Sequence, residues 1–313
     1  MREDGHHGPR KRFASIARTV AAGAFLVAAL AGCSTVRIGY SQLDTLAQWT
    51  ADRYFDLDDA QEEAFRNRFR RLHEWHRHEQ LPDYADFLAR AKLRLERGLT
   101  DEDVHWFLDG LERRYAIIAE RGTDDAAALL LTITPRQLEF VQERWERLNQ
   151  RFASEHQIGA GIDEQRRAAA QRTIEQCRDW FGSLSIAQEQ VVRASVARME
   201  LAGPLRQRDR MRRQREFLTL MQLRGEPDAF REKLRHWLIH WEAGRSPESR
   251  RAFARSREQR IALLIALDRS LTPHQRSLAA GRLQGYIDDF RALSEQPGAQ
   301  ATTTLQDPAF RQP

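Results

Sequence analysis

From residue 40 onward, apolar side chains recur at the spacing of an α-helix. Val104, Leu108 and Leu111 begin one such stripe, and comparable stripes run through residues 138–152 and 230–241. A helix repeats every 3.6 residues, so these side chains share one face, whereas a half-buried strand would alternate apolar and polar positions. No stretch of the chain shows that alternation. The pattern therefore predicts an all-α fold with no sheet.

Prolines and capping residues divide this pattern into segments. Thr134-Pro135, Ser246-Pro247 and Thr272-Pro273 each place a capping side chain before a proline that suits the first helical turn. Leu81-Pro82 marks a further break. Because the connections are short, we expect an antiparallel bundle, or stacked helical hairpins, of about 10–12 helices. The expected helices span residues 40–55, 58–80, 82–97, 100–121, 124–132, 135–156, 161–181, 185–201, 204–223, 227–243, 247–269 and 272–293.

The first 32 residues have the pattern of a bacterial secretion signal. A basic segment at 10–12 precedes an apolar run at 20–30, which is too short for a permanent membrane-spanning helix. The run ends in Leu30-Ala31-Gly32-Cys33, and small residues directly before a Cys are typical of cleavage by the lipoprotein signal peptidase. Cys33 would become the lipidated N-terminus, with acyl chains such as palmitate as its anchor.

This signal predicts the organisation and the location of the chain. We expect a removed signal peptide at 1–32, a lipidated tether at 33–39, a helical domain at 40–295 and a disordered tail at 296–313. Ser34 after the Cys is typical of sorting to the outer membrane, so the inner leaflet facing the periplasm is favoured over the inner membrane. Once Cys33 is acylated, Cys177 is the one cysteine left, which excludes an internal disulfide.

Charge gives little support to a nucleic-acid partner. The formal net charge is +5, but residues 1–32 hold five basic and two acidic residues, so the mature chain is near 5 − 3 = +2. The expected partner is the membrane, reached through the N-terminal lipid, with envelope proteins, lipopolysaccharide or peptidoglycan as further candidates.

Four pentapeptides share an apolar residue, then Ser, Thr or Asp, then a Gln three positions later. They begin at Leu57, Ile133, Leu184 and Leu271. This spacing is typical of a capping box, in which the first polar side chain and the Gln each satisfy an amide at the helix start. We expect each Gln to lie near solvent and to contribute less than the cap itself. The signature also resembles the Leu-Thr-x-x-Gln motif of small periplasmic chaperones of the Spy and CpxP type.

A second resemblance is more specific and covers residues 33–90. Tyr40-Ser41-Gln42-Leu43-Asp44 is followed by Tyr54-Phe55-Asp56-Leu57, and then by Trp75-His76-Arg77 with Leu81-Pro82-Asp83-Tyr84. These elements resemble those of an uncharacterised family of proteobacterial lipoproteins, a domain of unknown function. The resemblance implies an all-helical lipoprotein and leaves its activity open.

Histidines offer two candidate clusters. His76 falls on the apolar stripe of its helix, so we expect a core histidine bonded to Asp44, Asp56 or Tyr84, with a catalytic role as the alternative. His236 and His240 have the i, i+4 spacing of a zinc pair, yet both lie off the apolar stripe, which favours a solvated pair. The sequence therefore predicts no metal site, no cofactor and no catalytic residue.

Arginines are concentrated in one expected helix. Such a run is usually a solvated face, but it also suits contact with lipopolysaccharide phosphates or peptidoglycan carboxylates. Leu205 and Met211 are the expected inward anchors of that helix. The arginines are Arg206, Arg208, Arg210, Arg212, Arg213 and Arg215.

These patterns favour a lipid-anchored, non-enzymatic binding or scaffold protein of the cell envelope that faces the periplasm. Three alternatives stay open: a periplasmic chaperone or membrane-anchored steric foldase, a hydrolase that uses His76, and a carrier of apolar ligands in a groove lined by Trp and Phe.

Overall fold

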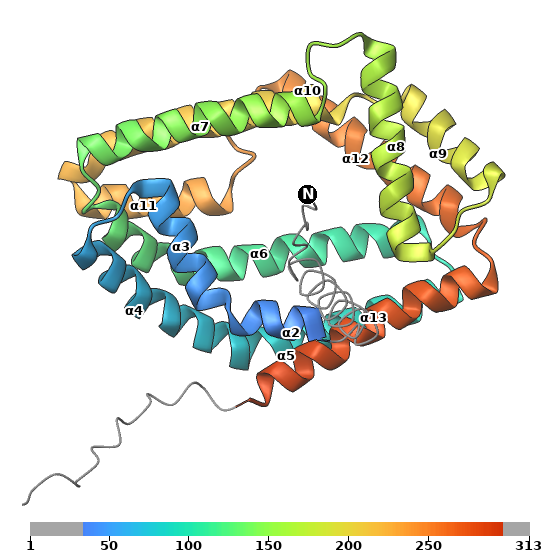
Figure 1. Ribbon diagram of the computed structural model, residues 1–313, viewed down its shortest axis with the longest axis horizontal. Coiled ribbons are helices and arrows are strands. Elements are labelled where there is room, and N and C mark those ends of the chain that lie inside the picture. The colour runs from blue at the N-terminus through green and yellow to red at the C-terminus, as the bar shows by residue number, and fades with distance from the viewer. Residues whose placement is uncertain (1–33, 297–313) are drawn as a thin grey trace, which may run out of the picture.

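The computed structural model describes residues 34–296 and shows an all-α protein (Figure 1). Within that range the β-type pairing is limited to an isolated bridge between Ile158 and Ala160. The α-helices are α2 (Ser34–Ser41), α3 (Leu43–Phe55), α4 (Asp59–Trp75), α5 (Leu81–Arg97), α6 (Asp101–Leu130), α7 (Pro135–Glu155), α8 (Ile162–Phe181), α9 (Ile186–Arg198), α10 (Ala202–Met221), α11 (Pro227–Ile239), α12 (Pro247–Asp268) and α13 (Pro273–Ser294). A π-helical turn, η1 (His76–Gln80), joins α4 to α5, and a 3-10 turn, η2 (Gln222–Gly225), follows α10.

The helices are arranged as a closed ring. In Figure 1, α7 and α10 form the upper side, α5 and α13 the lower side, and the ends are closed by α3 with α4 and by α8 with α9. The helix α6 pairs with α11 and also contacts α12. Many of the buried apolar residues of the described range form four clusters. The largest joins α6, α10 and α11 around Phe217, Phe230 and Leu234.

Residues 34–39, expected to be a tether, instead form most of α2. This helix packs against α13, and Arg37 Nε forms an ion pair with Asp289 Oδ1 at 2.5 Å. Asp289 is only 1% exposed, so its buried charge requires a partner of this kind. The expected signal peptide, the lipidated Cys33 and the expected tail beyond 296 lie outside the described residues.

The expected break at Leu81-Pro82 is wrong, because the chain stays helical from Asp59 to Arg97. Proline lacks an N–H, and its ring collides with the carbonyl four residues earlier in a regular helix. The π turn widens the helix just before Pro82, and the Leu81 N–H donates to His76 O, five residues back. Likewise α6 runs unbroken to Leu130, through Gly122.

All four expected capping boxes form, with Asp58, Thr134, Ser185 and Thr272 as caps. The expectation that their glutamines face solvent is wrong. Gln61, Gln137, Gln188 and Gln275 are each less than 8% exposed.

The glutamines are buried because the helix starts meet in two reciprocal pairs. Gln137 Nε2 donates to Gln61 Oε1 at 2.6 Å, and Gln61 Nε2 donates back to Gln137 Oε1 at 3.2 Å. Gln188 and Gln275 exchange the same two bonds at 2.9 and 3.0 Å. Each glutamine side-chain amide also donates to a backbone carbonyl of the motif with which it pairs, at the residue two positions before the capping residue of that motif. These acceptors are Asp56, Thr132, Ser183 and Ser270. The motif therefore joins α4 to α7 and α9 to α13.

Candidate functional site

The expected cluster around His76 forms only in part. His76 Nδ1 lies 2.9 Å from Tyr40 Oη, and the Tyr84 ring meets the imidazole edge-on at 5.3 Å between centroids. Asp44 instead pairs with His73, Oδ1 to Nδ1 at 2.7 Å. Asp56 ends α3 in a left-handed conformation with φ 52°, and its carbonyl accepts from Gln137 rather than from a histidine.

The electrostatics of this cluster favour neutral groups. Burial, followed by the charge of His73, lowers the pKa of His76 to about 4. Burial raises the pKa of Tyr84 to about 12 and also raises the pKa of Tyr40. Within the described residues, no three His, Cys, Asp or Glu side chains are grouped to hold a metal ion. The arrangement suits a packed, uncharged imidazole that joins α2 to η1 and α5.

The lowered pKa of His76 predicts a stability loss in acid. The unfolded pKa near 6.5 exceeds the folded value, so the stabilising contribution is present above pH 6.5 and declines toward pH 4. His76→Asn should remove that contribution and flatten the profile. Urea unfolding at pH 7 and pH 4.5 measures both proteins. An equal acid loss in the variant and the parent would contradict a neutral, buried His76.

The arginine run lies on α10 and divides into three groups. Arg206, Arg210 and Arg213 line a cavity of about 530 Å³ together with Arg245 and Arg260. Arg212 is bonded to acidic neighbours on its own helix. Arg208 and Arg215 are exposed, as Arg206 is, but they do not line the cavity. Leu205 is buried as expected, whereas Met211 is 41% exposed, so the expectation that it anchors the helix is wrong.

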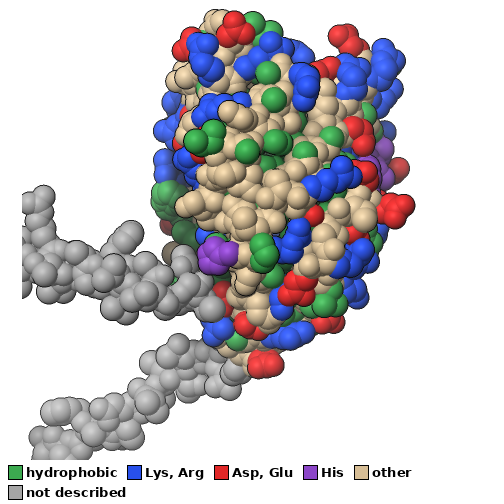
Figure 2. Space-filling model, turned by 90° about the vertical axis from the view of Figure 1, so that its right-hand side faces the viewer, with side chains coloured by type: hydrophobic (Ala, Val, Ile, Leu, Met, Phe, Trp, Pro, Cys, Tyr) green, Lys and Arg blue, Asp and Glu red, His purple; other side chains and the backbone are tan. Residues whose placement is uncertain are grey.

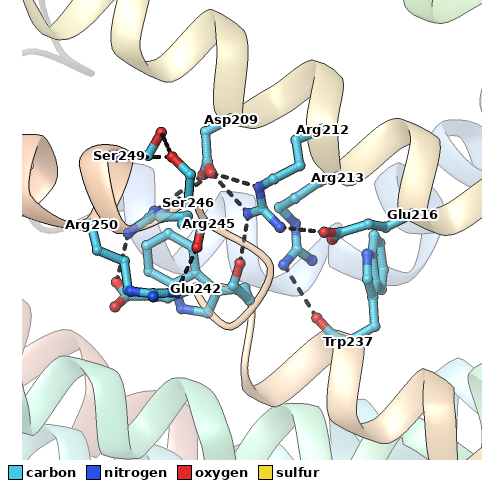
Figure 3. Close-up of polar contacts among 11 residues, drawn as sticks. Asp209, Arg212, Arg213, Glu216, Trp237, Glu242, Arg245, Ser246, Ser249 and Arg250 are labelled. Carbon is cyan, nitrogen blue, oxygen red and sulfur yellow. Dashed lines mark hydrogen bonds and ion pairs between the residues drawn. The ribbon is translucent and has the colours of Figure 1, made fainter.

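An ion-pair cluster centred on Asp209 forms one wall of this cavity (Figure 3). Arg245 Nε lies 3.1 Å from Asp209 Oδ1, and Arg245 Nη2 lies 3.1 Å from Oδ2. Arg212 bonds Asp209 Oδ1 at 2.8 Å and Glu216 Oε1 at 2.6 Å. Burial opposes ionisation of Asp209, but the bonds from Arg245 and Arg212 outweigh it and hold its pKa below the usual range.

Arg245 reaches this cluster from the loop between α11 and α12. It is 4% exposed, and its guanidinium carbon lies 3.6 Å from the Phe253 ring centroid and 4.4 Å from that of Trp241. The preceding Gly244 packs against the ends of the Glu216 and Arg212 side chains, which would have to move to admit a Cβ. The loop is therefore held against α10 by charge and by close contact.

The other cavity arginines have no carboxylate partner. Within the described residues, no ion pair joins an acidic group to Arg206, Arg210, Arg213 or Arg260, in contrast to the pairs that Asp209 makes with Arg212 and Arg245. Arg213 donates to Trp237 O at 3.2 Å and stacks over the Trp237 ring at 4.2 Å. Arg210 donates to Asn149 Oδ1 at 2.7 Å.

The local environment disfavours these positive charges. Burial lowers the pKa of Arg213. Although solvent reaches Arg260, partial desolvation and the charges of Arg206 and Arg257 lower its pKa as well. The indole Nε1 of Trp237 is buried and has no hydrogen-bond partner in the described structure. An anion held among the arginines would relieve the repulsion between their charges.

The arginine cavity adjoins further cavities in the interior. A cavity of about 360 Å³ between α8, α10 and α12 shares Arg206 and Arg260 with it. That cavity in turn shares Cys177 and Leu264 with a third, of about 530 Å³, which is mainly apolar. Burial raises the pKa of the Cys177 thiol, which favours an unreactive lining residue. The third cavity is lined by Leu95, Leu99, Trp106, Phe107, Phe181 and Leu283, among others.

The outer surface differs from this interior. On the face that Figure 2 shows, the right-hand side of Figure 1, basic and acidic side chains are interspersed. His236 and His240 are both exposed, with ring centroids 4.9 Å apart. The chain thus carries a mixed surface on this face and a concentration of arginine and tryptophan in the cavity.

Sequence reasoning found the α10 arginines but missed their partners. Arg245, Arg260, Trp145, Trp237 and Trp241 come from four other segments, and no local pattern connects them to α10. The N-terminal sequence motif includes Tyr40, but nothing in the sequence predicted its hydrogen bond to His76.

Fold and site together define an all-α protein with an arginine-lined interior cavity. The chain belongs to a family of unknown function, DUF6279, whose model matches residues 53–250. The matched segment includes the α10 arginines and Arg245 but not Arg260. Comparison with curated proteins and with solved structures gave no significant match. None of the described helices is long and apolar enough to cross a bilayer.

Proposed function

We propose that the protein is a lipid-anchored binding protein of the cell envelope, held in the inner leaflet of the outer membrane and facing the periplasm. The lipobox at 30–33 and the likeness to proteobacterial lipoproteins support the anchor. Lipidation at Cys33 would hold the folded body at the membrane surface, because α2 begins at Ser34 and is bonded to α13 through Arg37.

The arginine-lined cavity carries the binding part of this proposal. Guanidinium groups without carboxylate partners, one of which, Arg213, stacks on the Trp237 indole, suit phosphate or carboxylate groups. Lipopolysaccharide and peptidoglycan present such groups beside the outer membrane. The chaperone alternative receives less support, because its Leu-Thr-x-x-Gln glutamines are buried in reciprocal pairs.

The anchor has a direct test. Cys33→Ala should abolish acylation and move the protein from the membrane pellet to another fraction, because the modified sulfur atom is removed. Labelling with an alkyne fatty acid and cell fractionation measure both effects, and Cys177→Ala is the matched control. Unchanged labelling of the Cys33 variant would contradict the lipoprotein assignment.

The binding role is tested by photo-crosslinking in cells. A photoreactive amino acid at Gln214, which lines the cavity, should capture an envelope molecule that bears phosphate or carboxylate. The same probe at the exposed Arg208, on the same helix, should not capture it. Mass spectrometry identifies the adduct. Equal capture from both positions, or capture of uncharged molecules alone, would contradict the proposal.

A further inference from the structure

We propose that three adjoining cavities bind an anionic amphiphile, with its phosphate or carboxylate head in the solvent-reached cavity among Arg206, Arg213 and Arg260 and its acyl chain in the apolar cavity between α5, α6, α8 and α13. This inference rests on the proposed function, which supplies an anion for the arginines. It adds the chemical class of the ligand and the path that the ligand follows through the protein.

The head end is built from two different elements. Arg206 and Arg213 are separated by two helical turns on α10, and Arg260 faces them from α12, because all three line one cavity. Trp237 lines the same cavity, where its carbonyl and its ring contact Arg213. Asp209, the carboxylate of this cavity, is already bonded to Arg245 and Arg212, so it does not neutralise the other three. The charge of the site therefore stays positive and complements an anion.

The tail end has the opposite chemistry. Leucines and aromatic side chains from α5, α6, α8 and α13 dominate the apolar cavity. Its charged lining residues already have partners: Arg94 lies over Trp106 and pairs with Asp103, and Asp268 pairs with Arg276. Its volume of about 530 Å³ lies in the range of about 300–1,000 Å³ found for ligand sites.

The two ends are linked by shared lining residues. The intermediate cavity shares Arg206 and Arg260 with the arginine cavity, and it shares Thr173 and Cys177 with the apolar cavity. A small hydrophilic anion would leave the apolar cavity unused, and an uncharged hydrophobe would leave the arginines without a partner. A molecule with both properties matches the whole interior, and a membrane anchor would place the protein beside such molecules.

Native mass spectrometry of the full-length, membrane-extracted protein tests the inference with four probes. These are dioctanoyl phosphatidylglycerol, dioctanoyl phosphatidylcholine with the same chains but no net charge, glycerol 3-phosphate with no chains, and decanoate. We expect phosphatidylglycerol to bind at least about tenfold more tightly than phosphatidylcholine, since charge-assisted bonds are involved. It should exceed glycerol 3-phosphate by about a hundredfold or more, since each buried methylene adds affinity. Decanoate separates a fatty-acid ligand from a phospholipid.

Matched variants assign the site. Arg206→Gln with Arg213→Gln removes two cavity charges and should weaken phosphatidylglycerol binding at least about tenfold. Arg208→Gln with Arg215→Gln removes two charges at the same spacing on the same helix, outside the cavity, and should leave binding unchanged. Thr173→Trp should block the passage and weaken phosphatidylglycerol but not glycerol 3-phosphate. Melting temperatures show which variants are folded. If the double variant is unfolded, the single variant Arg206→Gln takes its place in the binding measurement.

Each result decides the inference. Equal binding of phosphatidylglycerol and phosphatidylcholine, or equal loss in the two double variants, overturns it. Binding of glycerol 3-phosphate as tightly as phosphatidylglycerol also overturns the amphiphile, yet it leaves the anion-binding role of the proposed function intact. Absence of binding by all four probes overturns both the head and the tail assignments.

Discussion

Replacing Arg245 by alanine is expected to lower the free energy of unfolding by about 3–5 kcal/mol, the effect found when one partner of a buried ion pair is removed. Arg245 is 4% exposed and makes two bonds to Asp209. Its loss leaves Asp209 with Arg212 alone and also removes the stacking on Phe253 and Trp241. Denaturant unfolding at pH 7 measures the change.

Two controls separate this role from a general effect of charge. Arg251→Ala, at an exposed position nearby on α12, should change stability by less than about 0.5 kcal/mol. Arg245→Lys keeps the charge but cannot make the two parallel bonds, so its stability should fall between the parent and the alanine variant. If Arg245→Ala and Arg251→Ala were equally stable, the cluster would not hold the α11–α12 loop to α10.

The second large effect is expected at the paired capping glutamines. Gln275→Ala should destabilise the fold by about 2–3 kcal/mol, because it removes both bonds to the buried Gln188 and leaves the Ser183 carbonyl without its donor. Thr272→Ala removes one cap and should cost about 0.5–2 kcal/mol. This order reverses the expectation from sequence, in which the glutamine contributes less than the cap.

A double-mutant cycle tests the pairing itself. Gln188→Ala and Gln275→Ala should be coupled by about 0.5–3 kcal/mol, since they share two hydrogen bonds. Gln137→Ala and Gln275→Ala belong to different pairs with no shared partner, so their effects should add. Equal coupling in both cycles would rule out a specific pair and would return the glutamines to simple local caps.

Local chemistry accounts for the features that sequence predicted well. A capping box uses atoms within four residues, and helical periodicity is visible within one or two turns. The helix starts at Asp58, Thr134, Ser185 and Thr272 were therefore predictable. The same local rules failed at two places. At Pro82 a widened π turn keeps the chain helical. At residues 34–39 the chain is also helical, and there Arg37 pairs with Asp289, about 250 residues away in the sequence.

The chain by itself determined the helical class, the position of the helix starts and the concentration of arginine on α10, since each depends on neighbouring residues. Only the tertiary structure decided which arginines are neutralised. Asp209 is paired with Arg245, which the α11–α12 loop brings to α10, while Arg206, Arg213 and Arg260 line the same cavity without an ion pair of their own in the described residues. The energy of a charge depends on its burial and its nearest partners, and both are set by contacts between segments far apart in sequence.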